Sequence, residues 1–232
     1  MRFSSFSGTS GGVKRYGRWF VLAFICVALV LVLVPAVSLG STTNVTLKAA
    51  PASVIAGGAV KLTATACSCP SGATFTLLSK GSSGSWTAVA TSPASKCGTA
   101  VFNVRVLRNT SFEVTLKSSH TTVTSKAVCV KVCAKLTLCV TPPTYGGVGI
   151  SGTLVPGWNG GKVTITIAKV VHCWRTVKVA TLSVPLTQGV GDSSVFATSW
   201  TGAQGNTTYV FTVKVATTAD FNGACVSKCR KL

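Results

Sequence analysis

Hydrophobic and polar residues alternate along most of the chain after residue 41. Val60, Leu62 and Ala64 alternate with the polar residues Lys61, Thr63 and Thr65. The same period of two recurs at Phe75 and Leu77, at Phe102, Val104 and Val106, at Phe112, Val114 and Leu116, at Val163, Ile165 and Ile167, and at Tyr209, Phe211, Val213 and Val215. This period is typical of strands that bury one face. Glycine pairs such as Gly57-Gly58 and Gly160-Gly161 supply turns. Because no helical period is present there, we expect an all-β fold.

Segments of residues 44–133 return in the same order within residues 134–232. Asn109-Thr-Ser-Phe112 matches Asn206-Thr-Thr-Tyr209, and Cys129-Val-x-x-Cys133 matches Cys225-Val-x-x-Cys229. Further matches join Val101-Phe102 to Val195-Phe196 and the segment that begins at Trp86 to the one that begins at Trp174. About seven short strands in about 90 residues indicate an immunoglobulin-like sandwich. The sequence therefore predicts two tandem immunoglobulin-like β-sandwiches, 44–133 and 134–232, with Phe112 equivalent to Tyr209 and Trp86 near Trp174.

The repeat resembles the tandem immunoglobulin-like repeat domains of bacterial and archaeal cell-surface proteins. The resemblance rests on the glycine turn and strand of residues 57–64, the strands that begin at Trp86, the strands centred on Phe102 and Phe196, and the Thr-Ser-Phe and Thr-Thr-Tyr strand starts. It covers nearly all of residues 44–232. It implies stalks, spacers, adhesion modules or envelope subunits more than any activity. The many cysteines and few acids depart from the usual pattern.

An apolar segment precedes the repeat. Trp19 to Leu39 holds no charged residue over 21 positions, and as a helix it would cross the roughly 30 Å core of a bilayer. Basic residues lie just before it, so the positive-inside rule places residues 1–18 in the cytoplasm and the bulk outside. Pro35 and the small residues after it also suit a signal peptide. Residues 19–40 are therefore a transmembrane helix or a signal peptide, and the protein faces the cell exterior or is secreted.

Charge is the most unusual feature of the composition. The chain has 22 Lys and Arg but three acids, namely Glu113, Asp192 and Asp220. Nucleic-acid binders usually concentrate their charge on a stripe or helix, whereas here the bases are evenly spread, apart from Lys228, Arg230 and Lys231. Nucleic acid is therefore not an expected partner. Three interpretations stay open: a solvated surface, attraction to anionic polymers or lipid head groups, and life in acid, where few carboxylates leave little to protonate.

Nine cysteines follow the apolar segment, and in an exported chain they indicate disulfides. The candidates are Cys67, Cys69, Cys97, Cys129, Cys133, Cys139, Cys173, Cys225 and Cys229. Residues four apart on a strand lie roughly 13 Å apart, so neither Cys129–Cys133 nor Cys225–Cys229 is an expected bond. We expect at least three disulfides with other pairings. The alternative is a metal site, but the spacings differ from zinc ribbons and the two histidines do not cluster with the cysteines, so no metal or other cofactor is expected.

Catalytic patterns are missing from the sequence. No Gly-x-Ser-x-Gly motif occurs after the apolar segment, and hydrolysis by paired carboxylates would require two of the three acids to meet. Three N-glycosylation sequons begin at Asn44, Asn109 and Asn206; asparagine also suits turns, which is the alternative explanation.

We conclude that the chain is a non-enzymatic surface or envelope protein acting as a spacer, adhesion or structural module. The alternatives are an accessory subunit of a membrane or pilus-like assembly, anchored by residues 19–39, and a basic module that binds polyanions or cell wall. Expected partners are other envelope proteins, further copies of the chain, and anionic polymers.

Overall fold

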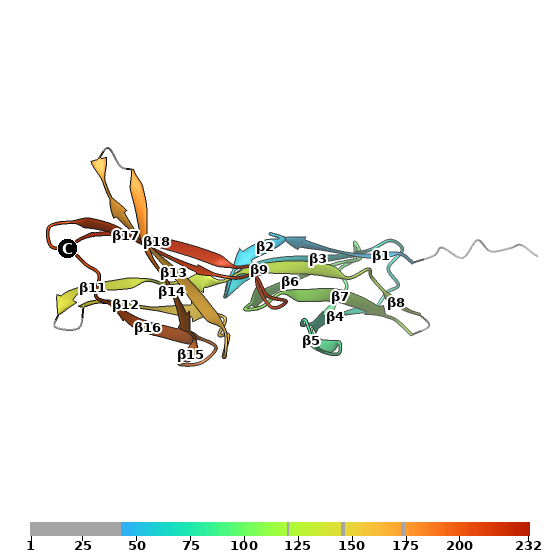
Figure 1. Cartoon of the computed structure of the whole chain (residues 1–232). Coiled ribbons are helices and arrows are strands. Elements are labelled where there is room, and N and C mark those ends of the chain that lie inside the picture. Colours follow the sequence, from blue (N-terminus) through green and yellow to red (C-terminus); the bar gives the residue numbers. More distant parts are fainter. Residues whose placement is uncertain (1–42, 120, 145–146, 173–174) are drawn as a thin grey trace, which may run out of the picture. The chain divides into compact units, whose positions relative to one another are not determined.

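The computed structural model describes residues 43–119, 121–144, 147–172 and 175–232. Within these ranges the chain forms β-strands joined by turns and loops, with no α-helix (Figure 1). The all-β class predicted from the alternation is thus confirmed. The described ranges contain no helix that could span a membrane. The basic residues 1–18 and the apolar segment 19–40 lie outside the described residues.

Residues 43–133, here called module 1, form two sheets. The strands are β1 (Val45–Ala50), β2 (Ser53–Ile55), β3 (Gly58–Ala66), β4 (Thr74–Lys80), β5 (Thr87–Pro93), β6 (Thr99–Val106), β7 (Thr110–Lys117), β8 (Thr122–Thr124) and β9 (Val128–Cys133). One sheet has the order β1-β3-β6. The other has the order β2-β9-β7-β4-β5, and β8 adds to β7. All pairs are antiparallel except β2 with β9.

Residues 134–232, here called module 2, also form two sheets. The strands are β10 (Lys135–Leu136), β11 (Cys139–Thr144), β12 (Gly147–Val155), β13 (Lys162–Val170), β14 (Thr176–Pro185), β15 (Thr187–Gln188), β16 (Ser194–Trp200), β17 (Thr208–Val215) and β18 (Ala224–Lys231). One sheet has the order β10-β12-β16-β15, with β11 also on β12, and the other has the order β14-β13-β17-β18.

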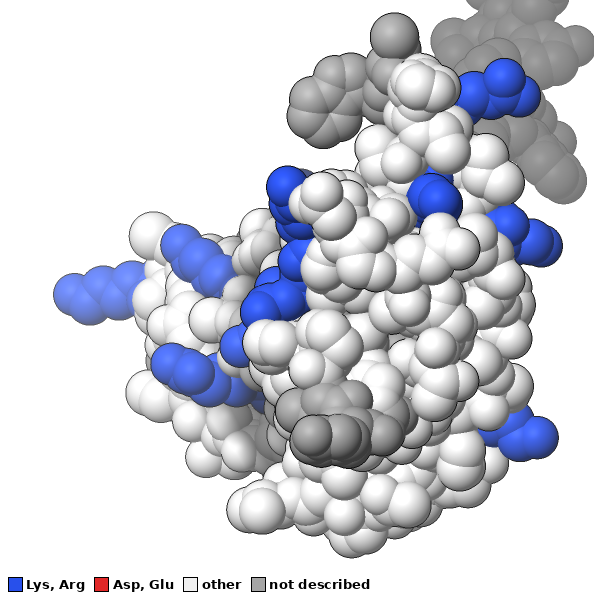
Figure 2. Space-filling view, turned by 60° about the vertical axis from the view of Figure 1, so that its left-hand side comes forward, with Lys and Arg blue, Asp and Glu red and all other residues white. Residues whose placement is uncertain are grey.

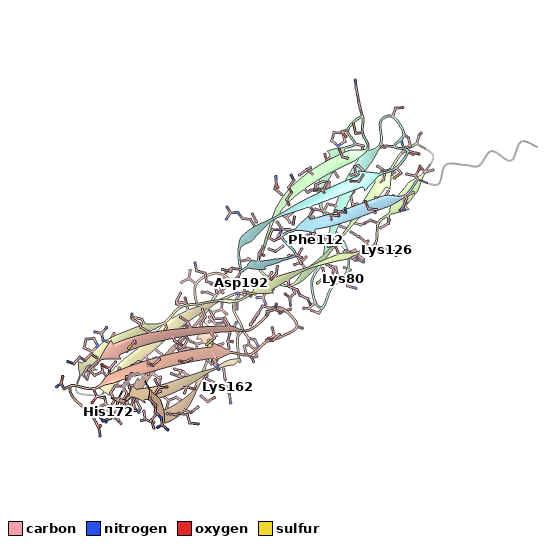
Figure 3. All side chains as sticks on the ribbon, turned by 90° about the horizontal axis from the view of Figure 1, so that it is seen from above. Lys80, Phe112, Lys126, Lys162, His172 and Asp192 are labelled. Atoms are coloured by element: carbon pink, nitrogen blue, oxygen red, sulfur yellow. The ribbon has the colours of Figure 1, made fainter. Side chains whose placement is uncertain are left out.

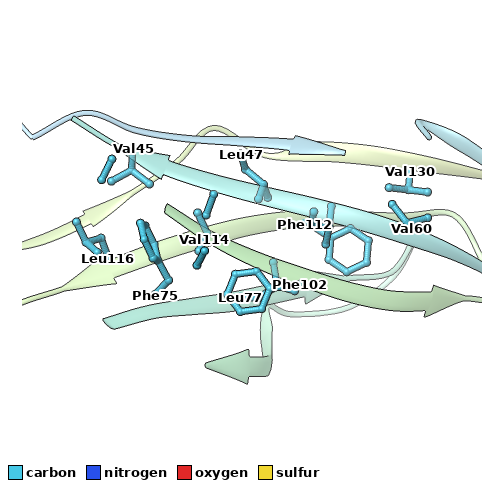
Figure 4. Close-up of a cluster of buried hydrophobic side chains, with 14 of the residues drawn as sticks. Val45, Leu47, Val60, Phe75, Leu77, Phe102, Phe112, Val114, Leu116 and Val130 are labelled. Carbon is cyan, nitrogen blue, oxygen red and sulfur yellow. The ribbon is translucent and has the colours of Figure 1, made fainter. Parts of the chain in front are cut away.

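Each module has its own hydrophobic core between its two sheets. The core of module 1 includes Val60, Leu62, Phe75, Leu77, Phe102 and Phe112, each at most 6% exposed (Figure 4). The core of module 2 includes Ile150, Ile165, Phe196, Tyr209, Phe211 and Phe221, each at most 2% exposed. The alternating residues predicted to point inward are all buried, apart from the half-buried Val104. Inward alternation from two facing sheets produces this arrangement.

Phe112 and Tyr209 occupy the same place in the two modules. Phe112 lies in β7 opposite Ser79 of β4 and Val128 of β9. Tyr209 lies in β17 opposite Lys169 of β13 and Arg230 of β18. Both strands are central in their sheets, and both rings are buried. The expected equivalence of the two aromatic residues is therefore observed, whereas Trp174, the expected counterpart of Trp86, lies outside the described residues.

The two Cys-Val-x-x-Cys segments are not equivalent in space, although they match in sequence. Cys129 pairs with Ser111, one residue before Phe112. Cys225 pairs with Lys214, five residues after Tyr209. The last strand of module 2 is therefore displaced along its neighbour relative to the last strand of module 1. The register follows the buried face of each strand, so the expected match of these two segments is wrong at the level of structure.

Gly152 in β12 lies opposite the break between β10 and β11, which both pair with β12. The pairs Leu136–Leu154 and Cys139–Ser151 keep one register, but β10 ends and β11 begins around Thr137 and Leu138. A Cβ atom at position 152 would lie 2.1 Å from the Thr137 carbonyl oxygen and 2.5 Å from Cζ of Phe196. The close approach of these two groups therefore requires glycine at this position.

We expect Gly152→Ala to destabilise the chain by about 1–3 kcal/mol, because an added methyl group must push a backbone carbonyl and a core ring apart. Gly205→Ala is the matched control in the same module, since a Cβ atom there would meet no atom within 4 Å. Denaturant unfolding followed by intrinsic fluorescence measures both. Equal stability of the two variants would contradict the close packing at Gly152.

Candidate functional site

The two modules follow each other with almost no linker. β9 ends at Cys133 and β10 begins at Lys135, so Ala134 is the one residue between them, and it is 7% exposed. The described residues of both modules belong to one compact unit. Independent motion of neighbouring domains usually requires an exposed linker that few contacts cross. The junction is therefore the candidate functional site, and loops of both modules contribute to it.

The first contribution to the junction comes from the loop between β6 and β7, which carries Arg108 and Asn109. Val106 at its start accepts a hydrogen bond from the Gly57 amide at 2.8 Å. The Thr110 hydroxyl at its end donates to the Arg108 carbonyl at 2.7 Å. The loop is thus held at both ends by module 1, and its two polar side chains extend toward module 2.

The second contribution comes from the loop between β17 and β18. The Thr218 hydroxyl accepts hydrogen bonds from the amides of Asp220 and Phe221, both at 3.2 Å. Phe221 is 1% exposed, and its ring meets that of Trp158 edge to face at a centroid distance of 6.1 Å. A core aromatic residue beside a turn capped by a hydroxyl fixes the backbone on either side. Asp220 therefore has a defined position at the end of module 2.

Arg108 binds both aspartates of the chain. Its Nη2 donates to Asp192 Oδ1 at 2.6 Å and to the Gly157 carbonyl at 3.2 Å, while Nη1 donates to Asp220 Oδ2 at 3.0 Å. Asp192 lies where the strands of the two modules meet (Figure 3). The Ser82 hydroxyl of module 1 also donates to Asp220. The planar fork of guanidinium suits two carboxylates at once. Two of the three acids in the sequence are therefore used on one arginine at the junction.

The ion pairs of Arg108 position the modules more than they stabilise them. The three side chains are 35–39% exposed, and a hollow of about 520 Å³ lined by Arg108 and Asp192 opens beside them. Exposed pairs of this kind contribute only about 0–1 kcal/mol each, because water and salt screen them. The network instead restricts how module 2 is oriented against module 1, since two carboxylates from separate loops must both reach the same guanidinium.

Asn109 supplies the buried part of the junction. It is 9% exposed. Its Nδ2 donates to the Ala219 carbonyl at 3.0 Å, and its Oδ1 accepts from the Val132 amide at 2.8 Å. Its own amide donates to the Asp220 carbonyl at 2.6 Å. Since a buried polar group without a partner costs more than a made hydrogen bond gains, this side chain ties the modules more strictly than the exposed ion pairs do.

A short backbone pairing completes the junction. Cys133 and Asn222 form a parallel bridge. The Asn222 amide donates to the Val132 carbonyl at 2.7 Å, and the Ala134 amide donates to the Asn222 carbonyl at 3.1 Å. The end of β9 is thus covered by the β17–β18 loop of module 2, which satisfies backbone groups that would otherwise be left at a strand end.

Hydrolysis by paired carboxylates would need two of the acids to meet, and Asp192 and Asp220 do lie close together. Both of them, however, bind the guanidinium group of Arg108. This is the arrangement of an ion-pair network, not of two acids on either side of a substrate bond. The third acid, Glu113, lies in β7 away from them. Sequence reasoning assigned no role to Arg108, Asp192 or Asp220. The available signal was the scarcity of acids, because two rare residues in two turns suggest a specific use.

The disulfide candidates are spread over both modules. The structure describes eight of the nine, and all eight are free thiols: Cys67, Cys97, Cys129, Cys139, Cys225 and Cys229 are exposed, and Cys69 and Cys133 are half-buried. Cys173 lies outside the described residues, as does His120. Among the described residues no group of three or more Cys, His, Asp or Glu is placed to hold a metal ion. Disulfide formation stays a prediction.

The three sequon asparagines differ in their surroundings. Asn44 and Asn206 are exposed, and Asn206 has a φ of 59°, a left-handed conformation that asparagine tolerates in turns. Asn109 is buried, and the nitrogen that would carry a glycan donates to Ala219. Glycosylation stays a prediction for Asn44 and Asn206, whereas at Asn109 a glycan would have to precede folding and would break the junction.

A second polar feature lies on the outer face of the β14-β13-β17-β18 sheet. Register places Thr181, Thr166, Thr212 and Ser227 in one row across the four strands. Lys178 and Lys214 border a groove of about 340 Å³ on this face, lined otherwise by Thr166, Ala168, Thr176, Val210 and Thr212. The view in Figure 2 shows Lys and Arg side chains spread over the surface and no acidic side chain. Hydroxyl groups and ammonium groups together suit an anionic ligand.

Comparison with known proteins shows no family. No family model matches the chain, and no curated protein matches it. Among solved structures it is similar to a tetra-tandem repeat from the extending region of a large adhesion protein, with 15% identity and a TM-score of 0.43 over 81% of this chain. The match spans about half of that protein, 48% of its length. A marsupial T cell receptor matches with 11% identity and a TM-score of 0.31, over 80% of this chain and 99% of the receptor chain. These scores are too low to support an argument about function.

We expect Asn109→Ala to lower the free energy of unfolding by about 1–3 kcal/mol, because the buried Val132 amide then loses its acceptor. The matched control is Asn103→Ala, since Asn103 is exposed on β6. Urea unfolding of both variants provides the measurement. A cost no greater than that of the control would show that Asn109 does not hold the junction.

Proposed function

We propose that the chain is a non-enzymatic spacer of a cell envelope or cell surface, built from two tandem immunoglobulin-like β-sandwiches held in one fixed orientation. The observation that carries this proposal is the junction: a one-residue connection, a buried asparagine that bonds to both modules, and an arginine bound to two aspartates of the following module. A chain that needed freedom between its modules would have an exposed polar linker instead.

The surface location is supported by the leading segment and by the β architecture. An uncharged stretch of 21 residues preceded by Lys14, Arg15 and Arg18 suits export or anchoring with the modules outside. Each module places two sheets around one core, the architecture by which tandem immunoglobulin-like repeats extend surface proteins. The proposed role is therefore to hold a partner, or further domains, at a set distance and angle from the envelope.

The experiment compares Arg108→Ala with the full wild-type chain and with Arg105→Ala. Arg105 is a neighbouring arginine on the exposed face of β6 that pairs with neither aspartate. ¹⁵N relaxation gives a rotational correlation time for each module. We expect equal times for both modules in the wild type and in Arg105→Ala. Arg108→Ala alone should keep nearly equal times, because Asn109 still holds the buried part of the junction. In the double variant Arg108→Ala/Asn109→Ala we expect the two times to separate while both cores are intact.

Two outcomes would count against the spacer proposal. Different correlation times in the wild type would mean that the modules already move independently. Equal times in the double variant Arg108→Ala/Asn109→Ala would mean that the contacts of Arg108 and Asn109, from which the proposal is argued, do not hold the modules.

A second candidate function is binding of an anionic polymer, and the charge balance favours it. Of the three acids, Asp192 and Asp220 both bind Arg108, which leaves 17 other Lys and Arg beyond the apolar segment with little internal compensation. The groove bordered by Lys178 and Lys214 offers such a ligand two ammonium groups beside threonine hydroxyls.

Binding of inorganic polyphosphate tests this second function. We expect affinity to fall steeply with salt, and the slope of log Kd against log salt to decrease by roughly one for each lysine removed from a phosphate contact. The double variant Lys178→Gln/Lys214→Gln should therefore show a slope smaller by about two. Lys48→Gln/Lys61→Gln, on the exposed face of the β1-β3-β6 sheet, is the control of equal charge. Salt-insensitive binding, or equal slopes in both variants, would contradict the site.

A further inference from the structure

Two loops of module 1 meet beside the start of β6. Arg108 and the junction lie beyond the other end of this strand. One loop joins β3 to β4 and contains Cys67 and Cys69, and the other is the turn between β5 and β6 that contains Cys97. They are joined on both sides by backbone hydrogen bonds: the Ala66 amide donates to the Gly98 carbonyl at 2.8 Å, and the Ala94 amide donates to the Ala73 carbonyl at 2.9 Å. The cysteines therefore lie in two short segments whose ends are already fixed against each other.

Cys69 lies directly against the residue that follows Cys97. A Cβ atom built at Gly98 would be 2.9 Å from Cβ of Cys69, a separation that real Cβ atoms do not show. Gly98 has a φ of 66°, a left-handed conformation that glycine adopts without strain. Its amide donates to the Ser95 carbonyl at 2.8 Å, so the turn from Ser95 to Gly98 is tight and holds Cys97 beside the Cys69 loop.

Burial and position distinguish Cys69 from Cys67. Cys69 lines a hollow of about 340 Å³ together with Ser95 and Lys96, the two residues before Cys97, whereas Cys67 does not line it and neither does Cys97 itself. Cys69 is half-buried and packs against the core of module 1. Cys67 is exposed. Its backbone amide donates a hydrogen bond to the carbonyl of Asn44, the residue that precedes β1.

We propose that Cys69 and Cys97 are a disulfide site that ties the β3–β4 loop to the β5–β6 turn, with Cys67 left as a thiol. The bond requires Cβ atoms about 3.5–4.5 Å apart, and Cys69 Cβ already lies 2.9 Å from where a Cβ atom of Gly98, the residue next to Cys97, would stand. The reaction is thiol–disulfide exchange with a small-molecule disulfide such as oxidised glutathione. The two protein thiols lose two hydrogens and form one S–S bond, and the oxidant is reduced to two thiols.

Tryptic mapping of the full chain tests the pairing. Cleavage after Lys61, Lys80, Lys96 and Arg105 places Cys67 and Cys69 in peptide 62–80 and Cys97 in peptide 97–105. After equilibration in a glutathione redox buffer and alkylation of free thiols, we expect these two peptides to be linked. Cys67→Ser should retain the link as the matched control, and Cys69→Ser and Cys97→Ser should each abolish it.

Thermal unfolding gives a second readout. Closing this loop should raise the Tm of the oxidised wild type and of Cys67→Ser by on the order of 10 °C over the reduced forms, and the Cys69→Ser and Cys97→Ser variants should lack this increment. A link that persists in Cys69→Ser, or a Cys97 that is still alkylated in the oxidised wild type, would overturn the proposal. Neither outcome bears on the spacer function, because the bond lies at the other end of module 1 from the junction.

Discussion

The connection between the two modules is so short that their orientation depends on what fills the junction. One buried residue, Ala134, separates β9 from β10. With no chain length to absorb a change of angle, every group at the interface must find its partner in one arrangement. Asn109 meets this constraint with three hydrogen bonds to fixed backbone groups, and the β17–β18 loop meets it by pairing with the end of β9.

The same constraint explains where the rare acids are. In a chain with 22 basic residues, carboxylates on an open surface would attract many cations without selecting one. Asp192 and Asp220 instead sit in turns whose positions the module 2 core determines, and both reach Arg108. The ion pairs are too exposed to add much stability, but they favour one docking geometry. The remaining basic residues are then free to act as a solvating surface or as a surface for anions.

Local patterns were sufficient to predict the strands and the core. Residues such as Val60, Ile165 and Phe211 could be assigned to the interior because a strand with one buried face must alternate with a period of two. The equivalence of Phe112 and Tyr209 followed in the same way. Local alternation does not predict the pairing register of two strands, since the register depends on which neighbouring strand each one meets. That is why the Cys-Val-x-x-Cys match failed, although the segments agree in sequence.

The junction could not be predicted from the sequence for a related reason. Arg108, Asp192 and Asp220 are separated by 84 and 112 positions along the chain, and nothing local in a turn shows which distant turn it will face. Asn109 gave a misleading signal, because the pattern that suits glycosylation also suits a buried asparagine that bonds to backbone. Only the register of both modules brings these residues together.

The most direct test of a fixed junction is the alignment of each module in solution. Residual dipolar couplings of backbone amides, measured in a weakly aligning medium, define an alignment tensor for residues 43–133 and another for residues 134–232. A fixed junction predicts tensors of the same magnitude and orientation when both are fitted to the structure. Tensors that differ in magnitude, as modules in independent motion produce, would contradict the account.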